Sequence, residues 1–388
     1  MIGHVREGKA RVSTPATPAH TTPVCGSSGW EALLLWFGSR LGLIVAATVG
    51  AALLSGADTA EPFLERWRRW DADLLIKIAQ YGYGGDPSQS PDAGLPAFFP
   101  GMPMAIRVVH SAVPGWILSG LLISLVAGAI AVVALVRLGD LDDRPGTGWR
   151  AVLALLLCPT AVFLFAGYSE ALFLAFAIPA WLAARRRNWR VAALLATGAS
   201  CVRITGLFLA LALIVEYASA GDASRDRWRA VWLVPPFLPL IGYSFYQHAR
   251  TGDWLAWQHA QEAGWGRTLV WPWESLHTTW IQASAEGPFA WAFRMEIAGA
   301  AVGVGTVLWL LAMRRWSEFV YVGLQVGALT FSAYYLSIPR SALLWWPLWI
   351  AIGRAGARNR WVLMVYALVA GPLMVLNTMA FLKGAWAG

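Results

Sequence analysis

Apolar residues along this chain gather in long runs and do not alternate with polar ones as barrel strands require. Many of the runs approach the roughly 20 residues that a helix needs to cross a bilayer core. Because only helices or closed barrels satisfy backbone polar groups in lipid, the pattern predicts an all-α polytopic membrane protein with about eleven transmembrane helices. The expected spans are residues 33–54, 116–138, 150–166, 168–184, 191–203, 204–217, 231–249, 296–313, 318–336, 342–354 and 361–382.

The charged residues between the spans predict the orientation, because cytoplasmic loops are enriched in Lys and Arg. More than half of the 30 Lys and Arg fall in the N-terminal tail and in short loops on one side. The other side receives two long loops, residues 55–115 and 250–295, which hold most of the acids. The basic loops all fall on one side of the membrane only if residues 191–217 cross it twice. We expect a plasma (inner) membrane protein with its N-terminus inside, and its C-terminus and functional loops on the extracytoplasmic side.

Composition narrows the class further. The chain is 57% hydrophobic and 13% charged. Residues 1–29 are rich in Pro, Thr and Ser, which predicts a flexible cytoplasmic tail before a single transmembrane domain of residues 30–388. The three Cys form neither a disulfide framework nor a zinc spacing, and no phosphate-binding glycine loop lies on the cytoplasmic side. We expect contacts with membrane lipids and none with nucleic acid.

The first outer loop carries the most unusual acid. Pro62 suits the first turn of a helix that runs to about Tyr83 and lies in the membrane interface. On that helix Asp71 projects into an apolar stripe centred near Trp67. A carboxylate among apolar groups binds a proton more readily unless a cation pairs with it, which suits a general base. The alternative is a helix that begins at Asp71, with this side chain as the N-cap.

The neighbouring features of this loop have more ordinary interpretations. Asp73 precedes Lys77 by four residues, a spacing that favours a helix-surface ion pair. The stretch from Ala97 to Pro103 brings aromatics and prolines back to the membrane edge. These residues either anchor the loop at the interface or wall a groove for a lipid chain.

Charged groups also stand at the outer ends of later spans. Glu170 follows Tyr168 and Ser169 where two apolar segments meet. Arg203 lies between the two halves of residues 191–217, and an arginine inside a span costs roughly 2.5–3.5 kcal/mol on insertion scales. It therefore needs Glu170 or a phosphate as partner. Arg340 occupies a similar outer position, and two such guanidiniums suit a phosphate-bearing lipid, with a purely structural Arg–Glu pair as the alternative.

The second outer loop is rich in Trp, Gln and His, including Gln258 and His259. This mixture suits stacking and hydrogen bonding to a sugar, but it is also typical of an aromatic belt at a membrane interface.

At these residues the sequence resembles the PIG-V family, the second mannosyltransferases of GPI-anchor synthesis, and its bacterial relatives among the GT-C glycosyltransferases. The shared motifs are Trp70-Asp71, Ile78-Ala79, Gly82-Tyr83, Ala97 to Pro100, Pro103, Pro159, Ala166 to Glu170, Arg203 with Gly206, Thr251 to Asp253, Gln258, Gly264 to Gly266, and Pro339-Arg340. The resemblance implies a GT-C bundle with a large first outer loop. It also implies inverting transfer of mannose from a prenyl-phosphate mannose, with Asp71 as the catalytic aspartate of that loop.

We therefore expect a glycosyltransferase that needs neither metal nor cofactor and acts on a glycolipid or glycan acceptor at the outer face. Asp71 is the expected base, and the expected substrate-binding residues are Tyr168, Glu170, Arg203, Gln258, His259 and Arg340. Two alternatives stay open: a transporter or flippase of a lipid-linked or polar solute, and a GT-C transferase that uses another prenyl-phosphate sugar such as arabinose. A membrane scaffold would leave Asp71 and Glu170 unexplained.

Overall fold

The computed structural model describes residues 29–54, 62–141, 144–219, 221, 227–287 and 289–388. Within these residues every named element is a helix, and an isolated β-bridge joins Leu269 to Ser332. The predicted all-α class is confirmed. The predicted flexible tail lies outside the described residues, except for its last position.

The α-helices are α1 Gly29–Leu54, α2 Asp71–Tyr81, α3 Gly101–His110, α4 Trp116–Leu141, α5 Thr147–Leu156, α6 Ser169–Arg185, α7 Trp189–Val202, α8 Thr205–Ser219, α10 Leu238–Thr251, α11 Ala256–Trp265, α12 Pro272–Ser284, α13 Ala290–Ala312, α14 Trp316–Thr330, α15 Ile338–Ser341, α16 Trp346–Arg358 and α17 Arg360–Leu382. Short 3₁₀ helices are η1 Glu65–Trp67, η2 Gly82–Gly84, η3 Leu95–Ala97, η4 Ala161–Leu164, η5 Arg227–Leu233, η6 Pro235–Phe237 and η7 Ala342–Leu344.

Helical structure falls in each of the eleven predicted spans. In the described part of the chain, four helices are long and apolar enough to cross a membrane: α1, α4, α13 and α17. Three shorter apolar helices, α5, α7 and α8, fill other predicted spans. The number of membrane crossings stays a prediction.

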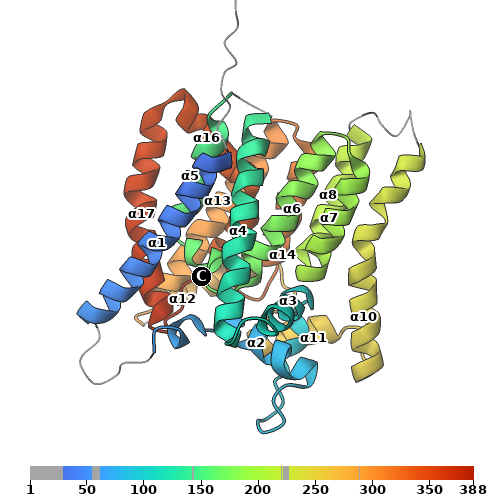
Figure 1. Cartoon of the computed structure of the whole chain (residues 1–388), viewed down its shortest axis with the longest axis vertical. Helices are drawn as coiled ribbons and strands as arrows, with labels where there is room; N and C mark the ends of the chain where they lie inside the picture. The colour runs from blue at the N-terminus through green and yellow to red at the C-terminus, as the bar shows by residue number, and fades with distance from the viewer. Residues whose placement is uncertain (1–28, 55–61, 142–143, 220, 222–226, 288) are drawn as a thin grey trace, which may run out of the picture.

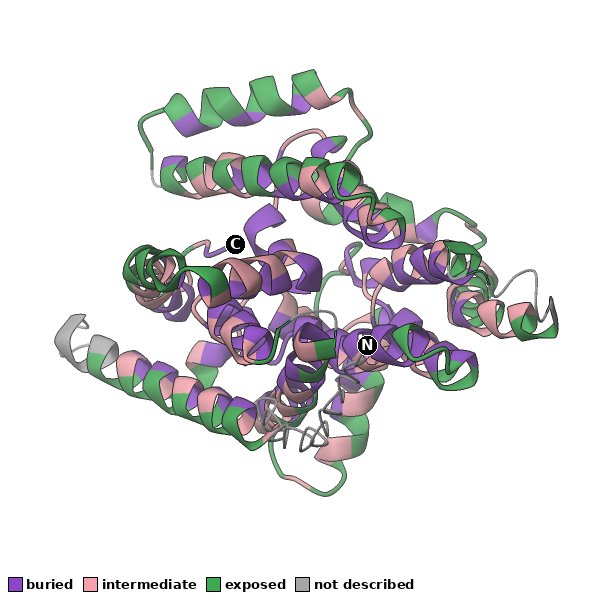
Figure 2. Ribbon diagram, turned by 90° about the horizontal axis from the view of Figure 1, so that it is seen from above, coloured by how far each residue is buried: buried purple, intermediate pink, exposed green. Residues whose placement is uncertain are grey.

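The long helices run side by side, and α2, α3 and α11 lie beyond one end of them (Figure 1). The arginine-bearing ends of α6 and α16 lie at the opposite end. Buried residues gather where the helices face one another (Figure 2). Glycine permits one of the close approaches, because a side chain at Gly128 of α4 would collide with the ring of Trp36 of α1.

The expected helix from Pro62 to Tyr83 is wrong in its first half. The chain forms η1, breaks, and starts α2 at Asp71, since Trp70 takes a backbone conformation with φ 49° and ψ −121°. Long-range contacts hold this break. The Tyr168 hydroxyl donates to the Arg69 carbonyl at 2.9 Å, and Arg69 Nη2 donates to the Leu382 carbonyl at 3.2 Å.

The predicted ion pair of Asp73 is confirmed, with Lys77 Nζ at 3.5 Å and Arg68 Nε at 2.5 Å from its carboxylate oxygens.

Labelling of cysteines tests the predicted sidedness. Ser88 is exposed in the first loop and Arg186 is exposed after α6. With Cys25, Cys158 and Cys201 replaced by Ser, we expect a membrane-impermeant maleimide to label S88C in intact cells and R186C only after permeabilisation. The reverse pattern would contradict the orientation.

Candidate active site

Four charged side chains from distant parts of the chain meet at one end of the bundle. Asp71 is the first residue of α2, and Glu170 is the second residue of α6. Arg203 directly follows α7, and Arg340 lies in α15. The sequence predicted all four as site residues, and the structure brings them together.

A chain of ion pairs joins them. Arg340 Nη1 lies 2.7 Å from Asp71 Oδ2, and Arg340 Nε lies 3.3 Å from Glu170 Oε1. Arg203 Nη1 lies 2.8 Å from the same Glu170 oxygen and donates to Ser169 Oγ at 2.6 Å. The Glu170 side chain is 0% exposed and that of Asp71 is 14% exposed. We call this set the Asp71–Arg340–Glu170–Arg203 network. It confirms Glu170 as the partner that Arg203 requires.

The network fixes the charge state of Arg340. Burial acts to lower the pKa of its guanidinium, but the charges of Asp71 and Glu170 outweigh burial and raise that pKa above its ordinary value. The N-cap position of α2 is held by Trp70, so the N-cap interpretation of Asp71 is wrong. Its carboxylate turns to Arg340 instead.

Tyr168 supports this arrangement and is itself 1% exposed. Its ring lies 5.5 Å from the Arg340 guanidinium carbon, and its hydroxyl is bonded to the Arg69 carbonyl. The Trp70 ring packs edge-on against Trp386 at 5.4 Å. Tyr168 thus contacts Arg340 and the backbone before Asp71, and Trp386 packs against the residue that precedes Asp71. Tyr168, predicted to bind substrate, is placed by the structure in a supporting position.

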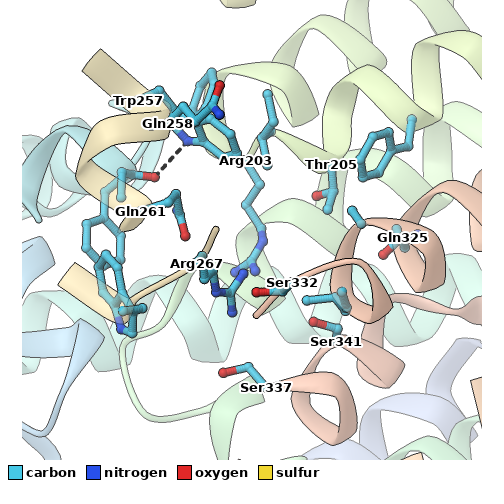
Figure 3. Close-up of a pocket in the computed structure, with 18 of the residues that line it drawn as sticks. Arg203, Thr205, Trp257, Gln258, Gln261, Arg267, Gln325, Ser332, Ser337 and Ser341 are labelled. Atoms are coloured by element: carbon cyan, nitrogen blue, oxygen red, sulfur yellow. Dashed lines mark hydrogen bonds between the residues drawn. The ribbon is translucent and has the colours of Figure 1, made fainter. Parts of the chain in front are cut away.

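A pocket of about 370 Å³ opens beside the network. Its charged lining residues are Asp71, Arg203, Arg267 and Arg340, and its amide residues are Gln258, Gln261 and Gln325. Aromatic side chains that line it are Phe98, Phe99, Phe208, Trp257, Trp265 and Phe331. Figure 3 shows Arg203 and Arg267 pointing into the same space, with Gln258 and Gln261 on the α11 side. Apolar walls with a few convergent polar groups are typical of a ligand site.

Helix α11 joins the two predicted outer loops across this pocket. Trp257 Nε1 donates to the Ala97 carbonyl at 3.1 Å, and the Trp265 ring packs edge-on against Phe98 at 5.5 Å. Ala97, Phe98 and Phe99 therefore wall the pocket, which favours the groove interpretation over simple anchoring.

The structure separates the two predicted residues of α11. Gln258 lines the pocket, whereas His259 is 58% exposed and pairs through Nδ1 with Asp253 Oδ2 at 2.6 Å. The α11 residues that line the pocket, Trp257, Gln258, Gln261 and Trp265, fall within about 100° of one another around the helix, and His259 projects outside that arc.

Arg267 is a pocket residue that the sequence analysis did not single out. Its Nη2 donates to the Leu336 carbonyl at 3.1 Å, while its buried Nε has no hydrogen-bond partner among the described residues. Burial, with the positive charge of Arg340, lowers its pKa to about 10, so the guanidinium stays charged at neutral pH. Arg267 follows Gly266, at φ 61°, in a loop. The only sequence signal was its place beside the Gly264 to Gly266 motif.

Within the described residues, no group of three or more His, Cys, Asp or Glu side chains is placed to hold a metal ion.

Comparison with known proteins agrees with the motifs. Residues 51–218 match the sequence model of the mannosyltransferase (PIG-V) family, a range that contains Asp71, Glu170 and Arg203. The resemblance to PIG-V mannosyltransferases is confirmed. GPI alpha-1,6-mannosyltransferase 2 of Mus musculus is 32% identical over 200 residues, which cover 48% of this chain and 38% of that protein. The Rattus norvegicus protein of the same name is 35% identical over 162 residues, covering 38% of this chain and 31% of its own. The chain thus aligns with less than half the length of these PIG-V relatives.

The fold has a wider likeness. The crystal structure of ArnT from Cupriavidus metallidurans bound to undecaprenyl phosphate superposes with a TM-score of 0.50 at 13% identity. The match covers 92% of this chain and 77% of that one. The helices of this PIG-V-like chain therefore form an ArnT-like fold.

Removal of Glu170 tests the network. Breaking a buried ion pair by deleting one partner costs about 3–5 kcal/mol, because the remaining charge is left uncompensated. We expect E170A to lower the Tm of the purified protein by several degrees, whereas E262Q, at an exposed acid of α11, leaves it within a degree. Thermal unfolding in detergent measures both. Wild-type stability in E170A would show that Glu170 does not hold the two arginines.

Proposed function

We propose that this chain is an inverting glycosyltransferase that moves mannose from a prenyl-phosphate mannose to a hydroxyl of a membrane-associated acceptor at the outer face. The observation that carries the proposal is the Asp71–Arg340–Glu170–Arg203 network, of which Asp71, Arg203 and Arg340 line one pocket. The PIG-V likeness supports mannose as the sugar. The undecaprenyl phosphate in the ArnT structure supports a prenyl-phosphate donor.

Asp71 serves as the general base in this proposal. Arg340 pairs with Oδ2, and Oδ1 has no hydrogen-bond partner among the described residues. As the acceptor oxygen bonds to the anomeric carbon, its proton passes to the Asp71 carboxylate. The bond from that carbon to the phosphate oxygen breaks, and the electron pair leaves with the prenyl phosphate. Attack opposite the leaving group inverts the anomeric centre.

The arginines would stabilise the leaving phosphate. Its negative charge grows in the transition state, where preorganised cationic donors are most effective. Arg203 and Arg340 are already paired with carboxylates, but among the described residues Arg267 has no carboxylate within ion-pair distance. Three guanidiniums in one pocket suit a phosphate through charge-assisted hydrogen bonds. We propose that they supply this stabilisation without a metal or other cofactor.

The other lining residues of the pocket suit the sugar and the prenyl chain of the donor. Gln258 and Gln261 are three residues apart, so they lie on one face of α11 and can hydrogen-bond sugar hydroxyls. Trp257 and Trp265 on the same helix offer flat rings for stacking. On the far side Phe208 of α8 and Leu329 of α14 provide an apolar wall for the first part of a prenyl chain. The acceptor, a glycolipid or glycan, would enter from the loop end.

Substitution of the base is the direct test. A positioned base contributes about 10²–10⁴-fold to a rate, so D71N should lower turnover by that factor while the protein still expresses and folds, because Arg340 keeps Glu170 as a partner. D73N, which removes the neighbouring surface carboxylate, should stay within a few-fold of wild type. Release of prenyl phosphate by the purified proteins measures the rates. Near-normal turnover of D71N would end the assignment of Asp71.

A panel of prenyl-phosphate sugars separates the proposal from its alternatives. We expect the purified protein to consume the mannose donor at least tenfold faster than the arabinose donor, and to release prenyl phosphate only with a hydroxyl acceptor. Preferred use of arabinose would replace mannose in the proposal. Solute movement in proteoliposomes without release of prenyl phosphate would identify a transporter.

A further inference from the structure

A buried carboxylate outside the pocket organises the segment that carries Arg340. Glu296 lies on α13 and is 1% exposed. Its Oε1 accepts a hydrogen bond from the Ser337 backbone N–H at 2.6 Å, and its Oε2 accepts one from the Ile338 N–H at 2.8 Å. An acid in a helix apolar enough to span a membrane is costly unless such partners satisfy it, and it marks a functional position by default.

The two amides belong to a strained turn. Ser337 has φ 64°, a left-handed conformation that is strained for a residue other than glycine. The surroundings must hold such a residue in place. Glu296 does so directly, and Thr160 Oγ1 donates to the Pro339 carbonyl at 2.9 Å. One turn further along α13, a Cβ on Gly299 would lie 3.1 Å from Pro339, so glycine lets α13 pack against this segment.

Two pocket arginines depend on the same few residues. Arg267 Nη2 donates to the carbonyl of Leu336, the residue before Ser337. Arg340, three residues after Ser337, reaches Asp71 and Glu170. The two Glu296 hydrogen bonds lie between these attachment points in the sequence. A shift of the backbone at residues 337 and 338 would therefore move both guanidiniums.

We infer that Glu296 is a positioning residue, which fixes residues 336–340 so that Arg340 meets Asp71. This inference rests on the proposed glycosyl transfer for its kinetic consequence. Glu296 is not among the pocket-lining residues and acts through Arg340. Because Asp71 works in the chemical step, loss of its alignment should lower kcat more than it raises KM for the donor.

The variants are chosen to separate geometry from charge. E296Q keeps the size of the side chain but turns an NH₂ donor toward one of the two N–H groups. E296D keeps the charge, but its shorter side chain moves the carboxylate away from the N–H groups of Ser337 and Ile338. The control is E318Q, which makes the same change at a buried acid of α14 paired with Arg315, outside the pocket lining. We expect kcat to fall at least tenfold in E296Q and E296D, with donor KM within threefold, and wild-type values in E318Q.

A double variant tests the route through Arg340. If Glu296 acts by aiming Arg340, E296Q/R340K should be no more than twofold slower than R340K alone, since the single effects are then not additive. E318Q/R340K should equal R340K. A full tenfold further loss in E296Q/R340K would overturn the inference, as would wild-type kcat in E296Q and E296D.

Hydrogen–deuterium exchange gives a readout that needs no turnover. Peptides covering residues 333–341 should exchange faster in E296Q than in wild type or E318Q, and peptides covering residues 69–73 should follow. Unchanged exchange in both regions would refute the positioning role even in an active enzyme. If the wild-type protein transfers no sugar from any donor, the proposed function fails, while the exchange comparison still decides whether Glu296 holds this segment.

Discussion

One guanidinium between two carboxylates sets the geometry of the whole site. Arg340 contacts Asp71 and Glu170, which lie 269 and 170 positions earlier in the chain. Buried charges are tolerated only when they are paired, so these acids can occupy apolar surroundings only if the first turns of α2 and α6 lie beside α15. Arg203 completes the pairing at the end of α7. Ion pairing thus holds the ends of four separate helices together, and the pocket lies beside them.

The same pairing explains how the site can be preorganised. Tyr168 and Trp386 hold the backbone around Asp71, and Glu296 holds the backbone before Arg340. With the two carboxylates of the network paired with Arg340 and Arg203, Arg267 is left as the cation without a carboxylate partner among the described pocket residues. Such a pocket favours binding of an anion beside the Asp71 carboxylate. The proposed transfer from a phosphate-linked sugar needs both a site for the phosphate and a base close to it. Little rearrangement is then needed when charge develops.

Local sequence patterns predicted the features that depend on residues close together in the chain or on the cost of a buried charge. Apolar runs located the helices, and the cost of Arg203 in a span pointed to Glu170 or a phosphate as its partner, of which the structure shows Glu170. The main expectation for the first loop, a helix from Pro62, was wrong and its alternative start at Asp71 was right, because the conformation of Trp70 depends on Tyr168, Leu382 and Trp386, which no local pattern contains. His259 was chosen by composition, while helix direction turns Gln258 to the pocket. Arg267 and Glu296 were not singled out, since their partners are backbone groups that only the folded chain brings near.

The central claim is that Asp71 and the arginines face the reacting ends of one donor molecule. An experimental structure with an unreactive donor, a prenyl phosphonate whose sugar is joined through carbon, tests it most directly. The account predicts the anomeric carbon beside the Asp71 carboxylate and the phosphonate in contact with at least two of Arg203, Arg267 and Arg340. A donor bound elsewhere, or an Asp71 carboxylate turned to bulk water away from the sugar, would contradict it.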